Sequence, residues 1–130
     1  MPRGSSKSTA TPRGKASLRL RLDFGEGRSL GPGKIHLLEL IHETGSISAA
    51  ARALEMSYRQ AWLLVDELNQ MFGEPVVSAQ TGGGGGGGTV VTEAGNAIVR
   101  LYRDLERRAR VASTTEIRAL ARRLAPTSAR

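Results

Sequence analysis

Apolar and charged side chains alternate over residues 18–24, and this period of two predicts a strand with one buried face. The segment from Gly25 to Gly33 is rich in glycine and contains a proline, so we interpret it as a turn region. Further along, two short β-prone runs at 76–79 and 89–91 flank seven consecutive glycines at positions 82–88. These two runs predict a hairpin with a glycine tip.

Four other segments repeat their apolar side chains at helical spacing, which predicts helices over residues 32–44, 46–55, 58–72 and 93–112. Ser46 and Ser57 are suited to cap the second and third of these helices, because a serine hydroxyl accepts a hydrogen bond from the first turn. Residues 1–15 are rich in Ser, Thr, Gly and Pro and are expected to form a flexible basic arm. Residues 113–130 have only weak helical periodicity, so we expect a weakly structured basic tail there.

The second and third predicted helices are separated by a tight break, which is typical of a helix-turn-helix. Three consecutive alanines, Ala49 to Ala51, allow two helices to cross closely at that point. The following hairpin would form a wing. The predicted fold is therefore mainly α with a small β wing: a winged helix-turn-helix domain over residues 16–112, which ends in a long dimerisation helix.

The start of the third predicted helix carries polar and aromatic side chains, as a helix that enters a DNA major groove requires. Arg59 is the strongest candidate for a base contact, because a guanidinium can bond guanine at two positions. Trp62 faces either DNA or the underside of the wing, while Arg52 and Lys34 either contact phosphate or lie in solvent. The complete set of predicted DNA contacts is Lys34, Ser46, Arg52, Ser57, Tyr58, Arg59, Gln60, Trp62, Thr81, Gly84 and Gly85.

The predicted helix over 93–112 is longer than a core of this size can cover. Its apolar face either packs on its own domain or meets the same helix of a second copy, and we favour a homodimer. The residues expected at this interface are Ile98, Leu101, Tyr102, Leu105 and Ala109.

The chain of 130 residues has a formal net charge of +7, but this charge is unevenly distributed. Residues 1–21 contain six basic side chains and no acid, and residues 100–130 contain nine arginines against three acids. Residues 22–99 contain four basic side chains against nine acids, so a DNA surface there must be a local patch. The basic ends favour either phosphate contacts or simple solubility.

Several classes of function find no support in the composition. Cysteine is absent, which excludes disulfides and thiolate metal sites, and His36 and His42 lie on different helix faces, so no metal site or cofactor is expected. Asp66 and Glu67 diverge around their helix and do not form an acid–base pair, so no enzyme is predicted. The glycine run lacks the strand–loop–helix context of a nucleotide site, and no apolar stretch is long enough to cross a membrane. The absence of cysteine fits a reducing compartment, so we expect a cytoplasmic location.

The stretch from Gly45 to Leu54, Gly-Ser-Ile-Ser-Ala-Ala-Ala-Arg-Ala-Leu, resembles the helix-turn-helix of LysR-type regulators. The run from Ile47 to Gly95 is more similar still to the N-terminal DNA-binding domain of the ModE-type, molybdate-responsive regulators, and the resemblance covers roughly residues 18–112. The motifs that carry this resemblance are Ser57-Tyr58-Arg59-Gln60-Ala61-Trp62, Glu67-Leu68-Asn69-Gln70, Thr81 with the glycine wing, Val91-Thr92 and Gly95.

This resemblance implies a winged helix that dimerises partly through its last helix and binds a palindromic operator in double-stranded DNA. In the family, molybdate is bound by separate C-terminal domains, and only 18 residues follow Ala112 here. We therefore expect a sequence-specific transcription regulator, linked to molybdate transport or molybdenum metabolism, that does not bind molybdate directly. Two alternatives stay open: a helical interaction module that acts on a partner regulator through residues 93–112 without binding DNA, and a molybdate-binding protein without a DNA role.

Overall fold

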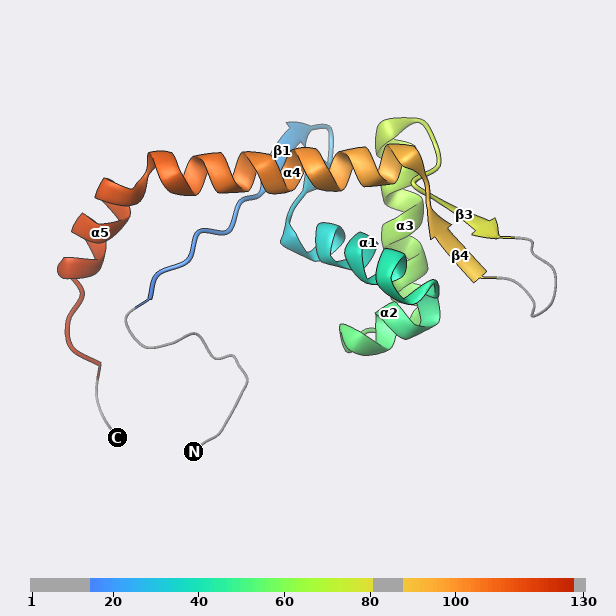
Figure 1. The fold of residues 1–130 in the computed structure, drawn as a ribbon, viewed down its shortest axis with the longest axis horizontal. Helices are drawn as coiled ribbons and strands as arrows, with labels where there is room; N and C mark the ends of the chain where they lie inside the picture. Colours follow the sequence, from blue (N-terminus) through green and yellow to red (C-terminus); the bar gives the residue numbers. More distant parts are fainter. Residues whose placement is uncertain (1–14, 81–87, 128–130) are drawn as a thin grey trace. The chain divides into compact units, whose positions relative to one another are not determined.

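The computed structural model describes residues 15–80 and 88–127 (Figure 1). All but the last residue of the expected arm over residues 1–15, and the wing tip with Thr81, Gly84 and Gly85, lie outside the described residues. Within those residues the elements, in chain order, are β1 (Leu22–Gly25), β2 (Arg28–Leu30), α1 (Pro32–Thr44), α2 (Ile47–Ala53), α3 (Tyr58–Phe72), β3 (Val77–Gln80), β4 (Gly88–Val91), α4 (Glu93–Ala112) and α5 (Thr114–Arg122). They divide into two units, Arg19–Leu105 and residues 106–127 with residues 15–18, and α4 passes from the first unit into the second.

Helices α1, α2 and α3 form the predicted helix-turn-helix, with α2 packed on both of the others. Gly45 ends α1 in the left-handed conformation with φ 71°, and its N–H donates to the carbonyl oxygen of Ile41 at 2.8 Å. The Ser46 hydroxyl then accepts from the N–H of Ala49 at 2.9 Å and begins α2. The predicted bounds of α1 and α3 are confirmed, whereas α2 is shorter than predicted.

The turn between α2 and α3 is a Schellman motif, in which two backbone bonds close the end of α2. The N–H of Glu55 donates to the Arg52 carbonyl at 3.1 Å, and the N–H of Met56 donates to the Ala51 carbonyl at 3.0 Å. Glu55 adopts φ 58°, a left-handed conformation that usually belongs to glycine. The break seen in the sequence is therefore a defined turn that fixes where α3 starts.

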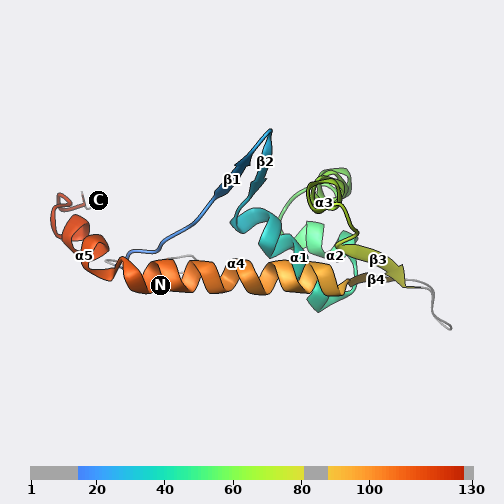
Figure 2. The ribbon, with the colours of Figure 1, turned by 90° about the horizontal axis from the view of Figure 1, so that it is seen from above.

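The N-terminal strand differs from the prediction. It begins at Leu22 instead of Leu18, and it pairs with β2, which lies inside the segment interpreted as a turn region. Figure 2 shows the two short antiparallel pairs, β1 with β2 and β3 with β4. The wing strands align Val77 with Val91 and Gln80 with Gly88, as the predicted hairpin requires. β4 is joined to the α1–α2 corner by a hydrogen bond from the Thr89 N–H to the Gly45 carbonyl at 3.0 Å.

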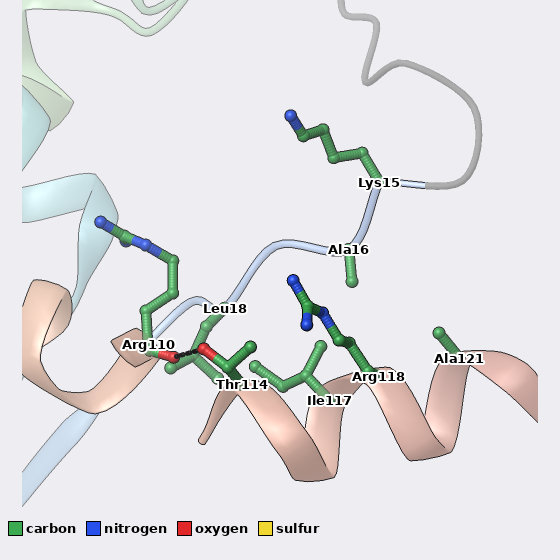
Figure 3. A pocket seen from close by; sticks show the side chains of 8 residues that line it. All are labelled: Lys15, Ala16, Leu18, Arg110, Thr114, Ile117, Arg118 and Ala121. Atoms are coloured by element: carbon green, nitrogen blue, oxygen red, sulfur yellow. Dashed lines mark hydrogen bonds between the residues drawn. The ribbon is translucent and has the colours of Figure 1, made fainter. Parts of the chain in front are cut away.

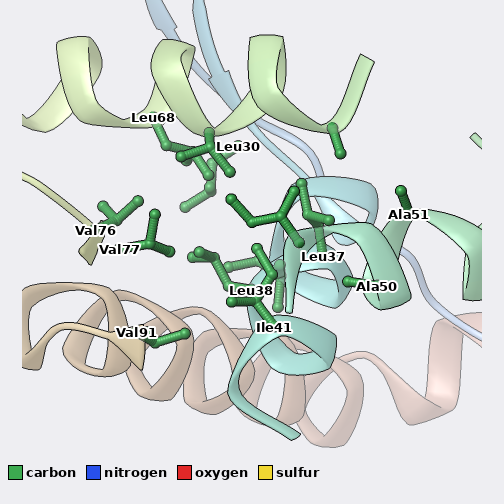
Figure 4. Packing of buried hydrophobic residues seen from close by; sticks show 14 of the residues in the cluster. Leu30, Leu37, Leu38, Ile41, Ala50, Ala51, Leu68, Val76, Val77 and Val91 are labelled. Carbon is green, nitrogen blue, oxygen red and sulfur yellow. The ribbon is translucent and has the colours of Figure 1, made fainter. Parts of the chain in front are cut away.

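The apolar core lies between α1, α3 and the wing strands (Figure 4). The fully buried large side chains are Ile35, Leu37, Leu38, Ile41, Val65, Leu68, Val76 and Tyr102. Gly95, in the first turns of α4, lies so close to the wing that an added Cβ would be 2.4 Å from the Val76 carbonyl oxygen. Glycine at this position lets α4 start directly on the wing strands.

Tyr102 and Arg103 join α4 to the rest of its unit. The Tyr102 hydroxyl donates to the Leu20 carbonyl at 2.6 Å, and the side chain is 1% exposed. Tyr102 is therefore a core residue, which corrects its assignment to the dimer interface. The Arg103 guanidinium donates to both oxygens of Glu39 on α1, at 2.9 and 2.8 Å, and these bonds lower the pKa of that carboxyl below its ordinary value.

The expectation of a weakly structured tail after residue 112 was wrong, because the second unit contains a further helix. Residues 114–122 form α5, and its polar start is joined to α4 by the Ser113 hydroxyl, which donates to the Ala109 carbonyl at 2.6 Å. The apolar side chains Leu120 and Leu124 stay exposed. The sequence periodicity of this segment was therefore a true helical signal that its polar composition obscured.

Candidate nucleic-acid interface

The first turn of α3 presents the predicted recognition residues on the surface. The Ser57 hydroxyl accepts from the N–H of Gln60 at 3.0 Å, which fixes the first turn. Tyr58, Arg59 and Gln60 are all exposed, whereas Ala61 points into the core. The cap and the buried alanine together hold this turn outward in one orientation.

Trp62 faces outward next to Tyr58 and is not part of the core. Its side chain is 41% exposed, and its ring meets the Tyr58 ring in a T-shaped arrangement, with centroids 6.4 Å apart. Of the two positions left open by the sequence, the outward one is therefore observed. Tyr58 and Trp62 form one row along α3, and Arg59 starts a second.

Leu63 belongs to this second row and was missed in the sequence. It is 56% exposed, one turn after Arg59, on the side of α3 opposite to Val65 and Leu68. The run Leu63-Leu64-Val65 hides it, because three apolar neighbours look like one buried segment. Only its angular position relative to the buried residues indicates that it points outward.

The row of Arg59 and Leu63 ends in a polar pair. The Gln70 amide donates to the Asp66 carboxylate at 3.0 Å, one and two turns further along α3. Asp66 is the first acid on this helix, so the uncharged and basic part of the outward face is limited to its first two turns. These two turns, with side chains Tyr58, Arg59, Gln60, Trp62 and Leu63, are called the α3 reading surface below.

Arg52 lies exposed on α2, where its guanidinium donates to the Ser48 hydroxyl at 3.2 Å. No carboxylate in residues 15–80 or 88–127 forms an ion pair with Arg52 or Arg59, so both keep their charge for a ligand. Ser46, by contrast, is half-buried, and its hydroxyl oxygen already caps α2. The two arginines are therefore the cations that the helix-turn-helix offers to a phosphate or a base.

Lys34 has a different position from the one predicted. Its ammonium donates to the Ser29 carbonyl at 2.7 Å and lies 3.5 Å from the Glu67 carboxylate, and its side chain is only 11% exposed. Lys34 ties α1 to the β1–β2 hairpin and to α3. Its charge is satisfied within the fold, which corrects the idea that it faces DNA.

An apolar groove lies beside α4 in the first unit and has a volume of about 150 Å³. Leu101 is 71% exposed at this groove, and Leu105 and the half-buried Ile98 line it as well. Phe24 on β1 and Phe72 at the end of α3 also line it, and the buried side chains of Leu30 and Tyr102 and the half-buried Leu22 lie at its base. Phe24 was not among the predicted interface residues, because its alternating strand pattern gave no sign that this side chain is exposed.

The second unit contains a cationic pocket of about 300 Å³ (Figure 3). Lys15, Arg110 and Arg118 surround it, above the apolar side chains of Leu18, Ile117 and Ala121. In the described part of the chain, no acid forms an ion pair with any of the three cations. Such a site suits an anion, and Arg110 and Arg118 belong to the basic C-terminal end seen in the sequence. Ala109, the last of the predicted interface residues, is half-buried in the same unit.

Across residues 15–80 and 88–127, no three His, Asp or Glu side chains gather closely enough to hold a metal ion. No helix in this part of the chain combines the length and the apolar character needed to span a membrane.

Comparison with known proteins finds a family match that includes all of α3. Residues 33–96 match the family "Bacterial regulatory helix-turn-helix protein, lysR family". The chain is 43% identical over 88 residues to the molybdenum transport protein ModE of Azotobacter vinelandii, which covers 68% of this chain and 33% of that protein. It is 44% identical over 80 residues to the molybdenum-pterin-binding protein MopB of Rhodobacter capsulatus, covering 62% and 30%.

A further relative is the DNA-binding transcriptional dual regulator ModE of Escherichia coli K12, with 38% identity over 88 residues that cover 68% of this chain and 34% of the relative. The chain thus spans about a third of the length of the relatives that it matches.

Proposed function

From the match of residues 33–96 to the lysR family of bacterial regulatory helix-turn-helix proteins, we propose that the chain is a sequence-specific transcription regulator of ModE type. Its partner would be an operator in double-stranded DNA, and its place of action the cytoplasm. The names of the relatives mention molybdenum, so we propose that the regulated genes concern molybdenum uptake or use. The proposal includes no catalytic activity and assigns no molybdate site to the residues described.

The observation that carries the proposal is the α3 reading surface. This helix start is capped by Ser57, is exposed on two rows, and carries an arginine that forms no ion pair within residues 15–80 and 88–127, so it fits a major groove. In this arrangement Arg59 donates to the O6 and N7 atoms of a guanine. Arg52, on α2, donates to a backbone phosphate and sets the position of α3.

We also propose that the protein binds as a homodimer, in which the apolar groove beside α4 meets its counterpart. Leu101, Leu105 and Phe24 would lose their exposed apolar surface in this contact. A two-fold dimer would place the two α3 helices in successive major grooves. The operator would then contain two inverted half-sites about 10 base pairs apart, or a multiple of that spacing.

The experiment that tests the function is selection of bound duplexes from a random pool, followed by titration of the enriched operator. Arg59→Ala is expected to weaken operator binding by about 10-fold to 100-fold per half-site, because a bidentate contact to guanine is lost in each. Arg28→Ala is the matched control: it removes the same charge from the exposed β1–β2 hairpin and should change affinity less than about three-fold.

Two results would contradict the proposed function. In the first, no sequence is enriched although the chain self-associates, which would favour the interaction module that acts on a partner regulator. In the second, Arg59→Ala and Arg28→Ala weaken binding equally, which would show that α3 does not read bases.

A further inference from the structure

Three large apolar side chains lie exposed together on the first two turns of α3. Tyr58 is 55% exposed, Trp62 41% and Leu63 56%. A single exposed leucine needs no explanation, but three such neighbours on a short surface indicate a contact. Hydrogen bonding by Arg59 to a base gives no role to Leu63, whose side chain has no donor or acceptor.

The major groove contains one apolar group, the C5-methyl of thymine. Leu63 lies four residues after Arg59 on the same face of α3, which is a rise of about 6 Å at 1.5 Å per residue. Base pairs rise about 3.4 Å each along the duplex, so these two side chains reach positions one or two base pairs apart. Beyond Leu63 the row continues with the hydrogen-bonded pair Asp66 and Gln70, which closes the apolar part.

We propose that Leu63, flanked by Trp62, reads the methyl group of one thymine in each half-site, one or two base pairs from the guanine bound by Arg59. The inference rests on the proposed function, since it requires α3 in the major groove. It goes further because it assigns a specificity-determining residue and the base that it selects. Leu63 discriminates by contact area alone, so it favours thymine over every base that lacks a methyl group at that position.

Replacement of thymine by uracil in the selected operator tests the contact, because it removes only the methyl group and keeps every base-pairing atom. At one thymine per half-site, uracil is expected to weaken binding of the unaltered protein by about four-fold for each half-site in which it is placed, the factor for one buried methylene-sized group. The other thymines serve as internal controls and should give no change.

Binding of the variant Leu63→Ala to both operators completes a double-mutant cycle, in which the side chain and the methyl group are removed singly and together. It should bind the thymine and uracil operators equally, with a loss on the thymine operator similar to that caused by uracil. Leu63→Met should retain part of the discrimination, because methionine offers a similar apolar volume. Leu120→Ala, a matched change of an exposed leucine on α5, should keep the full four-fold preference.

Because Leu63 is exposed, its variants should melt at the same temperature as the unaltered protein, so a change in binding reports on the contact. The inference is overturned if no thymine is sensitive to uracil, or if Leu63→Ala keeps the discrimination, while operator binding itself persists and the proposed function stands. Failure to enrich any operator would overturn the proposed function and this inference together.

Discussion

At the scale of single residues, Gly95 links the wing to the last helix of its unit. Its N–H donates to the Thr92 hydroxyl at 3.1 Å, and that hydroxyl donates to the Pro75 carbonyl at 2.8 Å. An added Cβ would lie 2.4 Å from the Val76 oxygen and 2.6 Å from a Val91 methyl group. The Val76 carbonyl accepts from the Thr92 N–H at 2.9 Å and Val91 belongs to β4, so both neighbours have little room to move away.

Replacement of Gly95 should therefore change the free energy of unfolding in the direction opposite to the one that helix propensity predicts. Gly95→Ala is expected to lower the free energy of unfolding by about 1–3 kcal/mol, although alanine favours a helix. Gly33→Ala is the control: it lies in the first turn of α1 with no atom near its Cβ position, and should raise the free energy of unfolding by up to about 1 kcal/mol. Urea denaturation measures both. If both variants changed the free energy of unfolding in the same direction, the close approach between Gly95 and the wing would be contradicted.

Residues whose function is local could be predicted from the sequence, while residues defined by distant partners could not. Ser46 and Ser57 act on their own helix ends, and the sequence identified both. Lys34 and Tyr102 are determined by atoms far away in the chain, at Glu67 and Leu20. No local pattern distinguishes them from surface or interface side chains.

At the scale of elements, the α2–α3 turn places the α3 reading surface. Its geometry requires a left-handed residue at position 55, where the chain has glutamate. A left-handed conformation costs a residue with a Cβ about 1 kcal/mol relative to glycine. The turn thus contains strain that a single substitution can remove.

Glu55→Gly is expected to raise the free energy of unfolding by about 0.5–1 kcal/mol, because glycine adopts φ 58° without steric cost. Glu55→Ala removes the same carboxylate but keeps the Cβ, so it should give no such gain. Thermal and urea unfolding of the two variants separate backbone strain from charge. A similar gain in both would indicate that charge, and not the turn conformation, is responsible.

Elements whose apolar side chains repeat with a clear helical period were predicted well, and elements of only a few residues were not. The stripes of α1, α3 and α4 extend over three or more turns, and their bounds agree with the structure. β2 has only three residues within a glycine-rich segment, and its existence depends on pairing with β1. Its formation is a tertiary effect that a single strand cannot reveal.

At the scale of the whole molecule, the proposed homodimer determines how the operator is bound. Leu101 is the most exposed side chain of the apolar groove beside α4, so a charge there should prevent the contact without disturbing the fold. We expect Leu101→Asp to be a monomer in sedimentation experiments and to lose at least about 10-fold in operator affinity, because two linked half-sites bind together.

Leu120→Asp is the control for this change, since Leu120 is similarly exposed but lies on α5, outside the groove. It should remain a dimer with full operator affinity. A Leu101→Asp variant that stays dimeric would show that another surface holds the two copies together, and that the groove has a different occupant.

The core contacts of α3 lie on one side, at Ala61, Val65 and Leu68, and the α3 reading surface lies on the other. The side chains that we propose to select DNA could therefore be exchanged without changes in the ones that hold the fold. Under the proposed function, duplicated copies of such a gene would acquire new promoters through a few substitutions at positions 59, 62 and 63. The same separation makes the domain a practical scaffold for regulators retargeted by design.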